Sequence, residues 1–95
     1  MARSRQATWT MMADEALRIR AYGRRAAHKG SVRALMAEAA DRALAGANEE
    51  ERMVYKLRYV DGMSYVVASQ KMYVSERTFY RILSGLIKKV EKEIA

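Results

Sequence analysis

The most distinctive chemistry in the chain lies between positions 75 and 90, where two arginines stand one helical turn apart. Arg77 and Arg81 each carry a planar guanidinium whose N–H groups match the O6 and N7 acceptors of guanine. Tyr80 could contact a thymine methyl group or a phosphate, or fold back onto the core, and Glu76 could accept from cytosine N4 or stabilise a helix start. These side chains suit a surface that meets base edges, with a solvated helix face as the alternative.

An apolar stripe on the same segment predicts the helix that must carry these side chains. The stripe recurs at offsets of three and four residues and consists of Phe79, Ile82, Leu83, Leu86 and Val90. Ser75 is a favourable N-cap for this helix, and Ser64 is one for a shorter helix before it. Two helices joined by a tight turn predict a helix-turn-helix whose second helix enters the DNA major groove.

Other polar residues near this motif are candidates for phosphate contacts, which position a protein on DNA without reading its sequence. Lys71, Lys88 and Lys89 are such candidates, and Ser84 lies on the same side of the helix as Arg81. Each lysine could equally well be a solvated surface residue.

Composition excludes several classes of protein. The 95 residues contain no cysteine and one histidine, so neither a disulfide nor a histidine or thiolate metal cluster is available. No apolar run approaches the roughly 20 residues of a membrane span, and the N-terminus lacks the apolar run of a signal peptide. We therefore expect a cytoplasmic protein with no membrane partner, no cofactor and no enzymatic activity.

Positive charge is concentrated at both ends of the chain, which has a formal net charge of +7. Residues 1–33 hold eight Lys or Arg and two acids, and residues 54–95 hold eight and four. Residues 34–53 hold only two against five acids. Basic ends indicate contact with phosphates, although a soluble cationic surface would have the same composition.

The absence of proline and the abundance of helix-forming residues predict an all-α fold of about five helices. We expect a loose basic tail over residues 1–8, then a helix from a Thr10 cap to residue 28. Two more helices are expected over 32–45 after a Ser31 cap and 49–60 after an Asn48 capping box. The residues expected on their buried faces are Met12, Ala16, Ile19, Val32, Leu35, Met36, Ala39, Ala43, Leu44, Met53, Val54, Leu57 and Val60.

Residues 49–83, with their L-R-Y-V-D-G-M-S-Y and V-S-E-R-T segments, resemble region four of bacterial sigma factors. They look most like the small ArpU-type regulators of phages and mobile elements. The resemblance covers roughly residues 32–94, which divides the chain into a basic N-terminal extension (1–30) and a DNA-binding domain (31–95). It implies a transcriptional regulator that binds double-stranded DNA, with RNA polymerase and a second copy of the chain as further candidate partners.

The resemblance also assigns roles to individual residues. It implies base contacts from Glu76, Arg77, Tyr80 and Arg81. Together with the candidates above, the expected phosphate contacts are Ser64, Lys71, Ser75, Thr78, Ser84 and Lys88.

Several positions depart from the family pattern, among them Ala68, which replaces a larger aliphatic residue and thins the core there. Tyr73 stands where such turns usually have glycine, which predicts a left-handed backbone at a cost of about 1 kcal/mol or more. Gly85 interrupts the second helix of the motif. Val66 and Val67 stand where glutamates are usual, so they either form a protein-contact patch or are buried under the N-terminal helix.

Two other functions compete with sequence-specific DNA binding. One is a protein-interaction module that contacts RNA polymerase or a sigma factor without an operator of its own. The other is a nuclease fragment, which metal-dependent DNA cleavage would reveal.

Overall fold

The computed structural model describes the backbone of residues 2–23 and 31–95 and the side chains of residues 8–22 and 31–95. Five α-helices account for most of these residues, two of them continued by a π-helical turn, and no strand occurs within the described ranges. The elements are α1 (Ala2–Arg18), η1 (Ile19–Gly23), α2 (Val32–Ala45), α3 (Glu49–Tyr55), η3 (Lys56–Val60), α4 (Tyr65–Lys71) and α5 (Glu76–Ile94). The all-α, five-helix prediction is confirmed.

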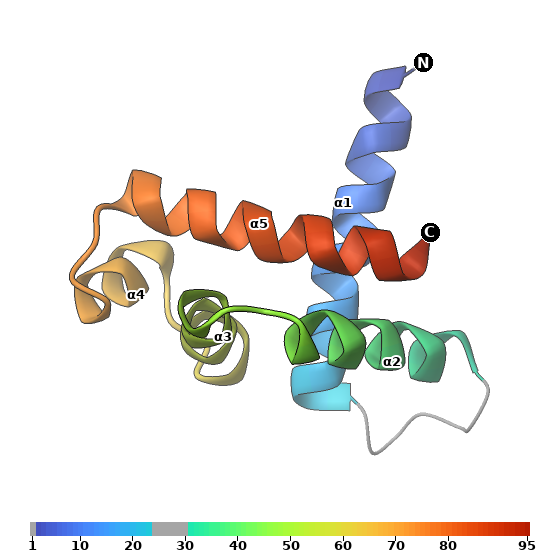
Figure 1. Ribbon diagram of the computed structural model, residues 1–95, viewed down its shortest axis with the longest axis horizontal. Helices are drawn as coiled ribbons and strands as arrows, with labels where there is room; N and C mark the ends of the chain where they lie inside the picture. Colours follow the sequence, from blue (N-terminus) through green and yellow to red (C-terminus); the bar gives the residue numbers. More distant parts are fainter. Residues whose placement is uncertain (1, 24–30) are drawn as a thin grey trace.

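Helix α5 runs the length of the molecule and packs against all four other helices (Figure 1). Its N-terminal half lies on α4 and α3, and its C-terminal half lies on α2 and crosses α1. The whole predicted apolar stripe of α5 is buried in one core shared with α1 and α2. No helix among the described residues is long and apolar enough to cross a membrane.

Local side-chain signals set the starts of four helices where the sequence predicted them. In each case a side-chain oxygen accepts from a backbone N–H three residues on, which satisfies a donor that the helix leaves unpaired. The four pairs are Ser31 with Ala34 (3.1 Å), Asn48 with Glu51 (2.8 Å), Ser64 with Val67 (3.3 Å) and Ser75 with Thr78 (3.1 Å). Gly62, at φ +70°, lies in the link between η3 and α4, as expected for a glycine stop.

The prediction of a loose tail before Thr10 is wrong, because α1 already begins at Ala2. The sequence offers neither glycine nor proline before Gly23, so nothing local stops a helix from extending to the N-terminus. Thr10 does not cap the helix; its hydroxyl donates to Glu91 of α5 at 3.2 Å. The end of the predicted helix, with His28, lies outside the described residues.

Four residues expected to be buried are largely exposed instead. Val32 and Leu35 are 72 % and 56 % exposed, and Met53 and Val60 are each 46 % exposed. Helix α2 is rotated so that small residues, among them Ala37 and Ala40, face the core. Alanine faces let helices approach closely, and this packing leaves Val32 and Leu35 outside while Leu44 stays buried.

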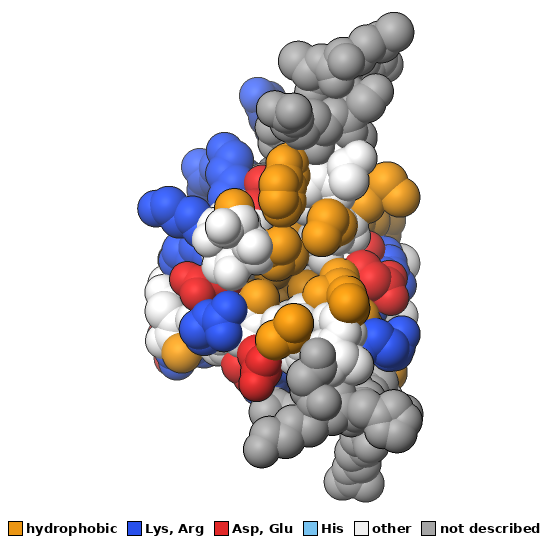
Figure 2. Space-filling view, turned by 90° about the vertical axis from the view of Figure 1, so that its right-hand side faces the viewer, with side chains coloured by type: hydrophobic (Ala, Val, Ile, Leu, Met, Phe, Trp, Pro, Cys, Tyr) orange, Lys and Arg blue, Asp and Glu red, His pale blue; other side chains and the backbone are white. Residues whose placement is uncertain are grey.

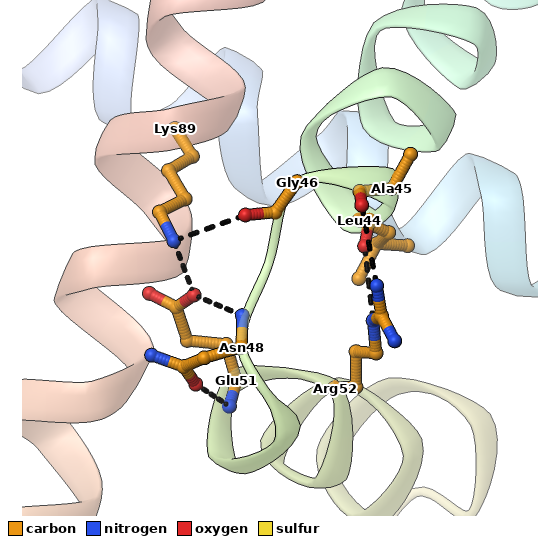
Figure 3. A network of polar contacts seen from close by, with 7 residues as sticks. All are labelled: Leu44, Ala45, Gly46, Asn48, Glu51, Arg52 and Lys89. Carbon is orange, nitrogen blue, oxygen red and sulfur yellow. Dashed lines mark hydrogen bonds and ion pairs between the residues drawn. The ribbon is translucent and has the colours of Figure 1, made fainter.

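A buried carboxylate joins α3 to α5 (Figure 3). Glu51 is only 5 % exposed; its Oε1 accepts from the Asn48 backbone at 3.0 Å, which completes the predicted capping box, and from Lys89 of α5 at 2.6 Å. A Cβ atom at Gly85 would lie 3.0 Å from Glu51 Oε2. Gly85, which on the sequence alone only weakens α5, therefore makes room for this carboxylate.

The clash predicts that the effect of Gly85→Ala depends on Glu51. In a Glu51→Ala background, Gly85→Ala should stabilise the fold by about 1 kcal/mol, the ordinary helix preference for alanine. In the wild-type background this gain should be lost, because hydrogen bonds hold the Glu51 carboxylate in place. Urea unfolding of the four proteins measures the difference, and additive effects would show that Gly85 does not accommodate Glu51.

Candidate nucleic-acid interface

The candidate interface is built on the two helices α4 and α5 and the turn between them. The turn is closed by backbone bonds from Met72 to Ala68 (3.1 Å) and from Val74 to Ser69 (3.0 Å). Tyr73 has φ +57° and is 96 % exposed, so the predicted left-handed aromatic is present and its ring extends into solvent. Buried Ala68 and Phe79 belong to the core, and their helices α4 and α5 pack together.

One exposed face of α5 carries the cations that the sequence predicted. Arg77, Arg81, Ser84 and Lys88 follow one another at offsets of four, three and four residues, so they lie on one side of the helix. All four are exposed, as is Glu76. We call the face formed by these four residues the basic stripe. No acidic side chain in the described part of the chain pairs with its three cations.

Five other described cations are already paired with acidic side chains. Among the described residues these pairs are Arg18–Asp14 (2.9 Å), Arg20–Asp41 (2.5 Å), Arg42–Glu93 (2.8 Å), Lys56–Asp61 (2.9 Å) and Lys89–Glu51 (2.6 Å). Lys89, a phosphate candidate from the sequence, is thus engaged with α3. Lys71 of α4 is exposed and has no acidic partner within residues 8–22 and 31–95.

Tyr80 stacks on another aromatic ring next to the basic stripe. Its ring centroid lies 4.4 Å from that of Tyr65, which in turn meets Phe79 edge-on at 5.8 Å. The guanidinium of Arg58 lies 4.5 Å from the Tyr65 ring, and Arg58 also donates to the Met63 carbonyl. Tyr80 remains 47 % exposed. The stack limits how the ring can move and leaves part of it accessible from solvent.

Sequence reasoning missed the contribution of Arg58 and Tyr65 to this stack. They lie 22 and 15 positions before Tyr80, so no helical periodicity relates the three residues. The only available signal was the arginine and tyrosine content of the Y-K-L-R-Y and S-Y segments.

The small hydroxyl residues of the motif act first as helix caps. Ser64 and Ser75 accept backbone N–H groups, and Ser75 also donates its proton to Thr78 Oγ1 at 3.0 Å. In the free protein the Ser75 proton is directed to Thr78, whereas the protons of the Ser64 and Thr78 hydroxyls are engaged in no hydrogen bond with the described residues. Ser84 lies exposed on the basic stripe.

Val66 and Val67 are exposed on α4 by 47 % and 45 %. The alternative in which the N-terminal helix buries them is wrong, because α1 packs on α5 and α2 instead. Two adjacent β-branched side chains thus remain partly in contact with water beside the motif.

A tyrosine beneath the interface connects α1 with η3. The Tyr59 hydroxyl donates to Asp14 Oδ1 at 2.5 Å, and Asp14 also pairs with Arg18. Burial raises the pKa of Tyr59, and the hydrogen bond to the Asp14 carboxylate raises it further. The phenol stays neutral and acts as a structural donor. Among the described residues, no three acidic or histidine side chains lie together in a way that could hold a metal ion.

Comparison of the chain with protein-family models, curated proteins and solved structures finds no match.

Proposed function

We propose that this protein binds double-stranded DNA sequence-specifically, with the N-terminal half of α5 in the major groove, and regulates transcription. The observation that carries the proposal is the basic stripe, which is exposed and unpaired on a helix whose opposite face is fully buried. Because those cations have no acidic partner among the described residues, binding an external polyanion breaks no ion pair of that part of the chain. In this role the protein would work in the cytoplasm, and the sigma region four resemblance suggests a phage or mobile-element origin.

Roles within the interface follow from position along α5. Arg77 and Arg81 would read bases, with Glu76 and Tyr80 beside them. Arg77 and Lys88 are separated by 11 residues, about 16 Å of helix at 1.5 Å per residue. The major groove is about 12 Å wide, so Lys88 would meet the phosphate backbone at its border. Ser64, Lys71, Thr78 and Ser84 would contact phosphates around the same groove.

Selection of bound duplexes from a random pool tests the proposal directly. An enriched sequence and a matching footprint are expected, together with affinity that falls steeply with salt. Failure to enrich any sequence, with only weak and uniform binding, would contradict base reading. The same incubations with Mg²⁺ would expose any nuclease activity as cleavage.

The exposed valines favour a protein contact as a second candidate role. We infer that Val66 and Val67 meet either RNA polymerase or a second copy of the chain, since large apolar side chains gain from being covered. Replacing both with glutamate should leave helical content unchanged and weaken self-association or transcription activation. Sedimentation and an in-vitro transcription assay measure the two effects, and unchanged values in both would remove this role.

A further inference from the structure

A cleft at the C-terminal end of α5 includes Lys88, where the proposed groove contact ends, and lies beyond the base-reading positions. It has a volume of about 630 Å³ and is lined by Trp9 of α1 and by residues of the last turns of α5, with Lys88, Lys89 and Lys92 among them. Figure 2 looks at the side of the molecule where these helices meet and shows Lys and Arg side chains gathered along one edge beside apolar ones. Glu91, which accepts the Thr10 hydroxyl, also lines the cleft, so the cleft combines an aromatic face with three lysines and one carboxylate.

Two of the three lysines are available to a ligand. Lys89 is held by Glu51 at 2.6 Å, whereas Lys88 and Lys92 are exposed and have no acidic partner in the described ranges. Lys92 follows Lys88 by four residues, so it extends the basic stripe by one more turn. Measured from Arg77, it lies about 22 Å along the helix, well beyond the width of a major groove.

The position of Trp9 is fixed by the packing of α1. Ala13, Ala16 and Leu17 are fully buried in the core, and Thr10 donates to Glu91 at 3.2 Å. Trp9 itself is half-buried. An indole offers a single N–H donor and a broad apolar face, which suit a phosphate oxygen and a sugar ring respectively.

We propose that the Trp9 cleft is a second DNA contact, which holds the sugar-phosphate backbone beside the groove that α5 enters. This inference rests on the proposed function and assigns α1 a direct part in it. Lys92 neutralises a phosphate, and Trp9 packs against the adjoining sugar and donates to the same strand. The contact carries no base information, so it strengthens binding to every sequence alike.

Trp9 is the only tryptophan, so its fluorescence reports on the cleft alone. We expect its emission to change as a selected duplex is added to the wild-type protein, and to saturate together with the anisotropy of the labelled duplex. Lys92→Gln should weaken selected and scrambled duplexes equally. The slope of log affinity against log salt concentration, here called the salt slope, should become smaller in magnitude by about 0.9 when one phosphate contact is removed. Raising salt from 50 to 200 mM should therefore weaken the variant about three- to fourfold less than it weakens the wild type.

Arg33→Gln is the matched control, because Arg33 is another exposed and unpaired cation and lies on α2, which does not line the cleft. It should leave the salt slope unchanged. Trp9→Phe keeps an aromatic ring in the cleft and should weaken both duplexes to a smaller extent. Circular dichroism verifies that each variant is folded.

The outcomes separate this inference from the proposed function. If the wild type binds its duplex with unchanged Trp9 emission, and Lys92→Gln behaves like Arg33→Gln, the cleft is not a DNA contact and the groove assignment stands. If no duplex binds even at 50 mM salt, the proposed function and this inference both fail.

Discussion

Replacing Arg77 and Arg81 together with alanine is expected to remove most of the preference for the selected duplex over a scrambled one. A bidentate arginine–guanine pair provides about 1–3 kcal/mol of discrimination, so losing two pairs costs about 2 kcal/mol or more, roughly thirtyfold in relative affinity. Both side chains are exposed and make no ion pair with any described residue, so stability should change by less than about 0.5 kcal/mol. Dissociation constants for the two duplexes at matched salt give the ratio.

Arg33→Ala combined with Lys71→Ala is the matched control for the double arginine variant. It also removes two positive charges, one from α2 and one from α4, and leaves the proposed base-reading positions unchanged. It should weaken both duplexes by a similar factor and leave their ratio unchanged. If the ratio is the same for wild type and for the double arginine variant, α5 does not read bases through these residues.

Phe79→Ala is expected to cause the largest loss of stability, about 3–5 kcal/mol. The Phe79 ring is completely buried, and it meets Tyr65 of α4 edge-on at 5.8 Å. Its removal leaves a cavity where the two helices of the motif meet. A domain of this size has a total unfolding free energy of about 5–15 kcal/mol, so a large share of it would be lost. Urea unfolding followed by circular dichroism measures the change.

Tyr73→Ala provides the comparison for Phe79→Ala. It also replaces an aromatic residue of the motif with alanine, but Tyr73 is 96 % exposed and has no ring contact to lose. Its unfolding free energy should stay within about 0.5 kcal/mol of the wild type. A Phe79→Ala protein as stable as Tyr73→Ala would mean that the joint between α4 and α5 is not packed around this ring.

Features governed by neighbouring residues were predictable from the sequence. The four N-caps and the glycine stop at Gly62 each depend on interactions within a few positions of the chain, whereas the left-handed Tyr73 was expected from the resemblance of its turn to the family pattern. The buried stripe of α5 followed from its period, because a long amphipathic helix has only one apolar side to bury. The exposure of Arg77, Arg81 and Lys88 followed from the same period.

Features governed by distant contacts were not predictable. Helix α2 has one face rich in alanine and another with larger apolar side chains, and its packing partners decide which face is buried. The sequence pattern predicted burial of Val32 and Leu35, which are exposed. The start of α1 at Ala2 was not predicted, because no glycine or proline before Gly23 marks a helix boundary in the sequence. The role of Gly85 required the position of Glu51, 34 residues earlier in the chain.

The sequence by itself determined that five helices form, four of them with a side-chain N-cap, and that a row of cations emerges along the last of them, since these features follow from contacts within one or two helical turns. Only the tertiary structure decided which cations stay available to a ligand. Lys89 and Lys88 are neighbours of equal charge, yet packing brings Glu51 within 2.6 Å of one and leaves the other exposed beside Trp9. That difference arises because α1, α3 and α5 meet in space, and side-chain spacing within α5 carries no information about such a meeting.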